Sequence, residues 1–434
     1  MAESTNTKQL GLARLYRRSF WTGSVAFLVL LASAVASMAQ EALQNQTYGE
    51  DAAVARTKAL QHQDYTVKYG DFRMLVTPYA GIQWNDNVNL SETNKMDDFI
   101  LTPGVTVVSS YPFTERNVLF LDISVGYSRY LNHPSLSTFD LNSSSGTGLS
   151  FDIGIKDVTI NLHDWISYVQ DAAQNGAVAN TANYGTFQNT AGLAATWDLN
   201  KASLSAGYDH QTVLSTSAEF DNVNHSAELL FVRGGVMVHP QVTVGIESTA
   251  AYTRYDKDIL NNNDAYTLGA YTDYTPDEFM KVSARGGYTT YQFQNSSPTV
   301  TTSDQNSWYA DLVFSHQPTD VISYSLTAGH SVSLGTQSDL NENWHVRPNI
   351  NWRIIKGWDF NTGFFYEHGK EGLGNVTGNN TETYDWYGGD LSVQHALTKN
   401  LTISLNYRLT LRNSDTPDNS YTQNLVGLQL TYHP

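Results

Sequence analysis

Residues 401–412 read LTISLNYRLTLR, and the pattern of this stretch recurs through most of the chain. One set of alternate positions is apolar: Leu401, Ile403, Leu405, Tyr407, Leu409 and Leu411. The other set is polar: Thr402, Ser404, Asn406, Arg408, Thr410 and Arg412. Because successive side chains of a β-strand point to opposite sides, a period of two predicts a strand with one apolar face and one polar face.

The same alternation appears in residues 119–127, 322–328 and 344–354, and it runs from about residue 72 to the end of the chain. Short turns and long polar loops alternate between the predicted strands, which number about 18, and this layout is typical of transmembrane β-barrels. The sequence therefore predicts an all-β fold, a transmembrane antiparallel up-and-down β-barrel of about 18 strands, over residues 72–434.

The first and the last strand of this predicted barrel should pair. In lipid every backbone N–H and C=O must find a partner within the protein, so we expect residues 421–432 to pair with residues 73–84. Alternate apolar residues continue to the end of the chain at Val426, Leu428, Leu430 and Tyr432. This ending resembles the C-terminal signal that barrel-insertion machinery recognises, which makes that machinery a predicted partner.

A large soluble β-protein, such as a propeller, is the alternative, since alternation alone does not say whether the apolar face points inward or outward. Three features favour an outward apolar face: a predicted export signal, small uncharged residues on the polar face, and aromatic residues near strand ends. Such aromatic residues form girdles at both membrane surfaces. They are Trp84, Tyr130, Trp165, Tyr255, Tyr274, Trp308, Trp344, Trp358, Tyr366 and Trp386.

The first 71 residues divide into two predicted segments. Residues 1–39 have a basic start, an apolar core at residues 24–36 and a small-residue cleavage site at residues 37–39, as a signal peptide does. The apolar core is shorter than the about 20 residues that a membrane-spanning helix needs. Residues 40–71 are predicted to be a periplasmic N-terminal segment, either a leader with a short helix or a small plug.

Composition excludes several classes of protein. The 434 residues include 25 Lys and Arg against 42 Asp and Glu, a net charge of −17, whereas nucleic-acid binders are usually basic. Cysteine is absent, so there is no disulfide and no thiolate metal site. The twelve His residues form no metal motif, and His163 and Asp164 have no serine in a nucleophile-elbow context. We therefore predict no cofactor, no metal and no enzymatic activity.

Charged residues fall on the polar face of the predicted strands. A basic residue on the lipid face costs about 2–4 kcal/mol at mid-depth, so these side chains should face a wet interior. The candidates for the lining of a pore are Asp122, Glu247, Arg285, Asp311, Arg347, Arg353, Glu367, Arg408 and Arg412. They either filter polar solutes with opposed charges or pair across neighbouring strands and simply fill the interior.

Residues 79–91, 97–116, 117–130 and 151–170 are similar to sequences of a known family. They read YAGIQWNDNVNLS, DDFILTPGVTVVSSYPFTER, NVLFLDISVGYSRY and FDIGIKDVTINLHDWISYVQ. They resemble the outer-membrane β-barrel porins that are associated with exopolysaccharide export. The resemblance implies a location in the outer membrane of a Gram-negative bacterium, in contact with lipid and lipopolysaccharide. It implies no catalytic residue.

Two functional interpretations follow. The first is a porin-like channel for small hydrophilic solutes or for exopolysaccharide-related export. The second is a closed barrel that acts as an adhesin or assembly partner, with its interior filled by residues 40–71 or by folded loops. A lipid hydrolase would require a Ser/His pair at the lipid-facing rim, and the sequence offers none that we would name.

Overall fold

The computed structural model describes residues 65–142, 148–377 and 381–434. The predicted signal peptide and residues 40–64 of the predicted N-terminal segment lie outside these described residues. In the part that is described, no helix has both the length and the apolar composition needed to cross a membrane.

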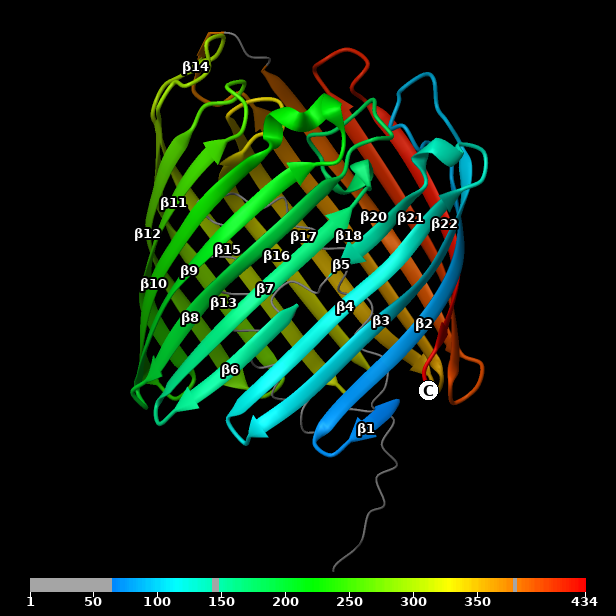
Figure 1. The fold of residues 1–434 in the computed structure, drawn as a ribbon, viewed down its shortest axis with the longest axis vertical. Helices are drawn as coiled ribbons and strands as arrows, with labels where there is room; N and C mark the ends of the chain where they lie inside the picture. The colour runs from blue at the N-terminus through cyan, green and yellow to red at the C-terminus, as the bar shows by residue number, and fades with distance from the viewer. Residues whose placement is uncertain (1–64, 143–147, 378–380) are drawn as a thin grey trace, which may run out of the picture. The chain divides into compact units, whose positions relative to one another are not determined.

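The predicted all-β fold is confirmed, because long antiparallel strands make up most of the described chain (Figure 1). The strands are β1 (Val67–Tyr69), β2 (Phe72–Asn85), β3 (Asp98–Thr114), β4 (Asn117–Tyr130), β5 (Thr138–Asn142), β6 (Leu149–Ile155), β7 (Val158–Val169), β8 (Thr186–Asp198), β9 (Ala202–Ser215), β10 (His225–His239), β11 (Val242–Tyr255), β12 (Asn263–Asp277), β13 (Met280–Phe293), β14 (Thr301–Thr302), β15 (Gln305–Thr319), β16 (Ile322–Leu334), β17 (Leu340–Ile355), β18 (Trp358–Glu371), β19 (Asn375–Thr377), β20 (Glu382–Ala396), β21 (Leu401–Ser414) and β22 (Tyr421–Tyr432). Three short 3-10 helices join them: η1 (Pro134–Leu136), η2 (Ala172–Gln174) and η3 (Ala218–Val223).

One sheet of 20 strands forms the wall of the barrel. Strand β1 pairs with β2, and β5 and β6 both pair with β4 and β7, so they form one wall strand in two pieces. Setting β1 aside and counting β5 with β6 leaves 18 strands, as predicted. The wall closes where β2 meets β22, from Tyr79 opposite Thr431 to Asn85 opposite Leu425. This pairing confirms the predicted closure.

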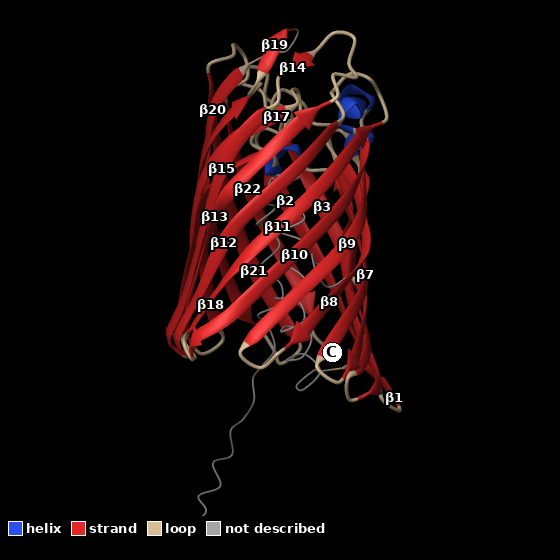
Figure 2. Cartoon of the chain, turned by 90° about the vertical axis from the view of Figure 1, so that its left-hand side faces the viewer, coloured by secondary structure: helices blue, strands red, loops and turns tan. Residues whose placement is uncertain are grey.

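The two ends of the barrel differ in the length of their connections (Figure 2). At one end, here called the turn end, neighbouring wall strands are joined by two to four residues. At the other end, the loop end, the connections are longer and contain η1, η2, η3 and the small sheet of β14 and β19. This alternation of short and long connections agrees with the rhythm predicted from the sequence.

Apolar side chains project outward from the middle of the wall. Strongly exposed examples are Val232, Ile246, Leu268, Phe364 and Leu405. Of the predicted girdle residues, Tyr274, Trp308, Trp344, Trp358 and Tyr366 are exposed near strand ends. Trp165 and Trp386 are buried, and their neighbours along the strand show that they face the interior, so their assignment to a girdle was wrong. An outward apolar band between aromatic rings is what strands that cross lipid require.

In the sequence the apolar phase changes at Gly388 and Gly389, since Tyr384 and Trp386 precede them and Leu391 follows in the opposite phase. This change predicts a bulge or a kink. Strand β20 nevertheless pairs with β18 and β21 without a shift in register. The phase changes because the interior itself becomes apolar at the loop end, where Tyr384 and Trp386 pack against an infolded loop.

A charge placed in the apolar band tests its orientation. Ile246 is 67% exposed near the middle of β11, so Ile246→Arg should cost about 2–4 kcal/mol of folding free energy in a bilayer. Urea titration of folding into lipid vesicles measures this cost. Gln292→Arg is the control, because Gln292 is exposed at the loop end of β13, where the cost falls to about 0–1 kcal/mol. Equal costs at both positions would contradict an outward lipid-facing band.

Candidate functional site at the loop end of the barrel

Two segments leave the wall and fold into the loop end of the barrel. The first is the inner hairpin, which we define as residues 331–343 at the tips of β16 and β17. Strand β16 pairs with β15 only as far as Ala310 opposite His330. Beyond that point the Tyr291 hydroxyl donates to the Val332 carbonyl (2.7 Å), and Val332 and Leu340 pack against the inner face of β10–β13. The β16 side of the hairpin therefore leaves the wall and leans into the barrel, whereas residues 341–343 stay paired with β18.

The second segment is the mouth loop, residues 170–185 between β7 and β8. Asp171 caps η2 by accepting a hydrogen bond from the Ala173 amide (3.1 Å), which fixes the turn of the chain into the interior. Ala173 and Val178 are buried in one apolar cluster with Trp386 on β20 and Tyr421 on β22. Since β20 and β22 are not neighbours of β7 or β8, the loop reaches another part of the wall. Burial of apolar side chains explains why a loop folds inward here.

Arg412 anchors the mouth loop to the wall. It is fully buried, and its Nε donates to the Gly176 carbonyl at 2.7 Å. Its Nη1 donates to the Asn419 carbonyl at 2.6 Å and lies 2.7 Å from the Glu382 carboxylate. The guanidinium also lies over the Tyr384 ring, 4.6 Å from its centroid. A buried charge is tolerated only when it is paired and hydrogen-bonded, and this site meets that requirement.

The inner hairpin is held in turn by β18. Glu371 is buried, and its carboxylate accepts hydrogen bonds from the Ser338 hydroxyl and from the Thr336 amide (3.3 Å). The Asp339 carboxylate accepts hydrogen bonds from the amide and the side chain of Asn261, both at 2.7 Å. These contacts tie the hairpin to the loops on either side of it.

The mouth loop and the inner hairpin meet at a seam. Asn175 donates to the Thr336 hydroxyl at 3.4 Å, and Asn222 in η3 donates to the Thr336 carbonyl at 2.9 Å. Asn175 also donates to the Tyr184 hydroxyl at 3.3 Å, and burial raises the pKa of Tyr184, so this hydroxyl stays protonated. The seam rests on uncharged hydrogen bonds, whereas each segment is tied to the wall by a buried charged group. It is therefore the weaker joint of the closed loop end.

Four of the five arginines predicted to line the interior lie in ion pairs with carboxylates. The pairs are Arg347 with Glu367 (3.3 Å), Arg353 with Asp359 (3.1 Å), Arg408 with Asp171 (3.3 Å) and Arg412 with Glu382 (2.7 Å). The Arg347 and Arg353 pairs join the neighbouring strands β17 and β18. This is the arrangement expected if the charged side chains pair across neighbouring strands and fill the interior. Arg408 and Arg412 instead hold the mouth loop, a role that the sequence did not suggest.

The other predicted lining residues lie on β4 and on the inner face of β11–β15. Asp122 is half-buried on β4, and Arg285 on β13 stands directly opposite Asp311 on β15. Glu247 on β11 is buried and accepts a hydrogen bond from the Tyr309 hydroxyl on β15 at 2.9 Å. The structure thus brings Arg285 and Asp311 together and separates Asp122 from both.

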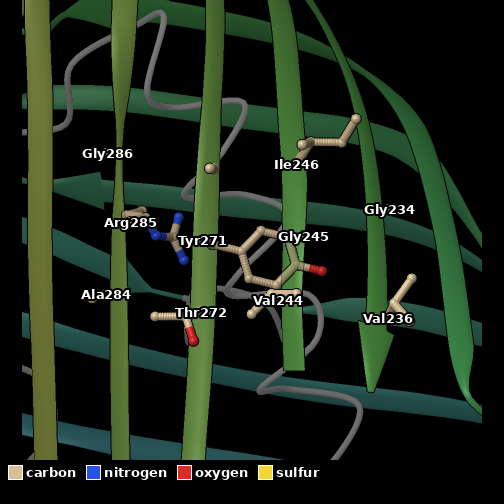
Figure 3. A pocket seen from close by; sticks show the side chains of 11 residues that line it. Gly234, Val236, Val244, Gly245, Ile246, Tyr271, Thr272, Ala284, Arg285 and Gly286 are labelled. Atoms are coloured by element: carbon tan, nitrogen blue, oxygen red, sulfur yellow. The ribbon is translucent and has the colours of Figure 1, made fainter. Parts of the chain in front are cut away.

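Some tyrosine side chains lie across glycines that face the interior, and sequence reasoning missed this feature. Tyr309 reaches from β15 to Glu247 across the glycines of two intervening strands, where a Cβ on Gly269 would lie 1.9 Å from its hydroxyl oxygen. Tyr271 likewise reaches from β12 over Gly245 (Figure 3), and the Arg233 guanidinium lies 3.6 Å from its ring centroid. Glycines in the polar phase of consecutive strands are the sequence signal for such packing.

The interior also holds one buried His–Asp pair. His163 Nε2 lies 2.8 Å from Asp209 Oδ1, Nδ1 lies 2.8 Å from Asn161 Oδ1, and the ring stacks on Trp165. With both ring nitrogens engaged, this histidine has a structural arrangement rather than that of a catalytic base. No group of three or more His, Asp or Glu side chains suited to a metal ion occurs within residues 65–142, 148–377 and 381–434.

A hollow of about 660 Å³ lies in the wall at β10–β13, towards the turn end (Figure 3). Val236, Val244 and Ile246 border it and are exposed on the outside, whereas Gly234 and Gly286 leave room between them. The hollow belongs to the apolar exterior and is not part of the interior path.

The chain was compared with known proteins. No protein-family model and no curated protein sequence matches it. Among solved structures it is similar to OccK2 (OpdF) of Pseudomonas aeruginosa in complex with glucuronate, with 11% identity, a TM-score of 0.45, and coverage of 84% of this chain and 98% of that one. A BenF-like porin of Pseudomonas fluorescens Pf-5 has 11% identity and a TM-score of 0.47, with coverage of 84% and 99%. OccAB3 of Acinetobacter baumannii has 11% identity and a TM-score of 0.46, with coverage of 84% and 99%.

Proposed function

We propose that this chain is an outer-membrane channel for small hydrophilic solutes in a Gram-negative bacterium. The observation that carries the proposal is the closed wall of 18 strands, with apolar side chains outside and ionisable side chains inside. A barrel of 16–18 strands is wide enough for an aqueous path, whereas one of about eight strands is filled by its own side chains. An interior that carries paired charges is suited to small polar solutes, which exchange hydrogen bonds with such groups.

Passage requires the seam at the loop end to open. The hydrogen bonds from Asn175 and Asn222 to Thr336 would break there, whereas Arg412 and the apolar cluster would keep the rest of the mouth loop on the wall. The inner hairpin would stay in place on Glu371 and Asp339. The solute would then meet the Arg347–Glu367 pair on β17 and β18 before it reaches the turn end. We propose that the candidate residues with partly exposed side chains, such as Asp311, Arg347 and Arg353, line this path and order the water and solute within it.

A closed binding or structural barrel is the second candidate, and the dense packing of the mouth loop favours it. Nine buried residues form that cluster, including Leu90 from the loop between β2 and β3 and Phe220 from η3. Such a barrel would present its interlocked loops as an adhesive surface and would carry no current. Export related to exopolysaccharide stays a prediction from the resemblance of residues 79–170, and no enzymatic activity is part of either proposal.

A reversible cross-link across the seam distinguishes the channel from the closed barrel. The native chain contains no cysteine, so N175C/T336C introduces the only two thiols. Asn175 Nδ2 and Thr336 Oγ1 are 3.4 Å apart, so a short cross-linker can connect cysteines at these two positions. A cross-linker that a reducing agent cleaves should abolish current in planar bilayers, and the reducing agent should restore it. Each cysteine alone, treated in the same way, serves as the control and should leave the current unchanged.

Absence of current from the untreated full chain would reject the channel and leave the closed barrel. Current that persists through a complete cross-link would retain a channel but would place its opening elsewhere than the seam. Mass spectrometry of the cross-linked protein establishes that the link is complete.

A further inference from the structure

A cluster of one Tyr, one His and one carboxylate occurs twice on the outside of the barrel. The first rim cluster consists of Tyr208 and His210 on β9 with Glu228 on β10. The second rim cluster consists of Tyr366 and His368 on β18 with Asp385 on β20. Each begins from a Tyr–acid–His sequence, YDH at residues 208–210 and YEH at residues 366–368. The middle residue of each faces inward, so the Tyr and the His face outward.

The two rim clusters share their geometry. In the first, His210 Nδ1 lies 3.0 Å from Glu228 Oε1, and the Tyr208 hydroxyl donates to the other carboxylate oxygen. In the second, His368 Nδ1 lies 2.9 Å from Asp385 Oδ1, and the Tyr366 hydroxyl donates to the same oxygen at 2.8 Å. The carboxylate stands directly opposite the histidine on the next strand in both cases.

Both rim clusters lie at the edge of the apolar band that is nearer the loop end. On β10, Leu230 follows Glu228 on the same outward face, and on β18, Phe364 precedes Tyr366; both apolar side chains are exposed. The histidine and carboxylate side chains are themselves 43–45% exposed. Strands β9 and β18 are eight strands apart along one side of the wall and ten along the other. Two equivalent sites thus face the boundary between hydrocarbon and water on nearly opposite sides.

We propose that each rim cluster binds a phosphate group of lipopolysaccharide in the outer leaflet. This inference rests on the outer-membrane location in the proposed function. It assigns the lipid partner of two specific places on the barrel.

The chemistry of the rim cluster selects an anion. The carboxylate receives both the tyrosine hydroxyl and the imidazole Nδ1–H, so its charge is largely satisfied within the cluster. Because the carboxylate holds Nδ1, Nε2 is the ring nitrogen left for a ligand, and with a proton on it Nε2 donates to a second anion. A neutral imidazole with the same partner would present a lone pair, which suits a metal ion, but a single such ligand makes a weak metal site.

A second cation stands near each rim cluster. Arg254, on β11 beside the first cluster, is paired with Asp264 at 2.7 Å and remains 42% exposed. Lys370 is exposed two residues beyond His368 on β18, with Glu342 opposite it on β17. A phosphate carries up to two charges and several acceptor oxygens, so it can bind the histidine Nε2 and one of these cations together. The acyl chains of the lipid would cover Leu230 or Phe364.

Binding of lipid A tests the inference. The full-length barrel in detergent is titrated with bisphosphorylated lipid A and with the same lipid after removal of its phosphates, and bound lipids are counted by native mass spectrometry. The wild type should bind two phosphorylated lipids in preference to the dephosphorylated form. H210Q or H368Q should each lose one, and the double variant should lose the preference, because glutamine removes the ring Nε2 that would contact the phosphate. H316Q is the matched control, since His316 contacts the Tyr324 hydroxyl (2.7 Å) at the turn end without a carboxylate.

Equal binding of the two lipids by the wild type, or a phosphate preference that survives in H210Q/H368Q, would overturn the inference. Displacement of the lipid by millimolar inorganic phosphate would show a free-anion site and would overturn the lipid assignment. Current through planar bilayers is recorded from the same preparations. A conducting barrel without phosphate preference refutes this inference alone, and a phosphate preference without current refutes the channel alone.

Discussion

Replacement of Arg412 by methionine should free the mouth loop and raise the single-channel conductance severalfold. Methionine keeps most of the volume but leaves the Gly176 and Asn419 carbonyls without the Arg412 donor and the buried Glu382 carboxylate without its positive partner. Removing one partner of a buried ion pair costs about 3–5 kcal/mol, which exceeds what the uncharged hydrogen bonds of the seam supply. Current recorded in planar bilayers at fixed voltage measures the change.

Arg353→Met is the control for Arg412→Met. Arg353 pairs with Asp359 near the turn end, and both side chains are about half exposed, so losing this pair should cost at most about 1 kcal/mol. The barrel should show its usual heat-modifiable mobility in both variants, because the strands pair through backbone atoms that the substitutions leave unchanged. Unchanged conductance in a folded Arg412→Met barrel would contradict the role given to the mouth loop.

The second large effect is expected at Gly269, where alanine should destabilise the wall at β11–β15. The new Cβ would lie 1.9 Å from the Tyr309 hydroxyl oxygen and 2.9 Å from the Gly286 carbonyl oxygen, so the ring must move. Its displacement leaves the buried Glu247 carboxylate without this hydroxyl, and overpacking adds to the loss, for a total of about 2–5 kcal/mol. Urea unfolding followed by loss of heat-modifiable mobility measures the change.

Gly234→Ala makes the same substitution on the outer face of β10. There the new Cβ would meet only the Leu204 side chain at 3.9 Å, which is an ordinary contact. We expect its unfolding midpoint to equal that of the wild type or to exceed it slightly, since alanine restricts the unfolded chain more than glycine does. Equal destabilisation by both substitutions would show that tyrosine packing over Gly269 does not stabilise the wall.

The wall of the barrel could be predicted from residues such as 401–412, because the strand period records which face meets apolar surroundings. The closure of residues 421–432 on residues 73–84 followed from a physical requirement that holds for any sheet in lipid. Both predictions depend on backbone geometry and alternation, which each strand carries in its own sequence.

The mouth loop and the inner hairpin could not be predicted in this way. Ala172, Val178 and Leu340 look like residues of an ordinary loop or strand tip, and their burial depends on distant partners such as Trp386. Because the interior is apolar at the loop end, the phase of the apolar residues changes along β20 at Gly388, and the sequence alone made this change look like a bulge or a kink. Arg412 lies in the polar phase of its strand and was predicted to line a pore. In the structure its guanidinium donates a hydrogen bond to the Gly176 carbonyl.

The most direct test of the central claim uses tryptophan quenching by lipids with brominated acyl chains. Apolar side chains face lipid and polar side chains face the interior, so the exposed tryptophans should be quenched; among the described residues these are Trp197, Trp308, Trp344, Trp352 and Trp358. Replacing these five by phenylalanine should remove most of the quenchable emission, whereas W165F/W386F should leave it unchanged, because Trp165 and Trp386 are buried inside. Quenching that disappears with W165F/W386F and persists without the five exposed tryptophans would contradict the account.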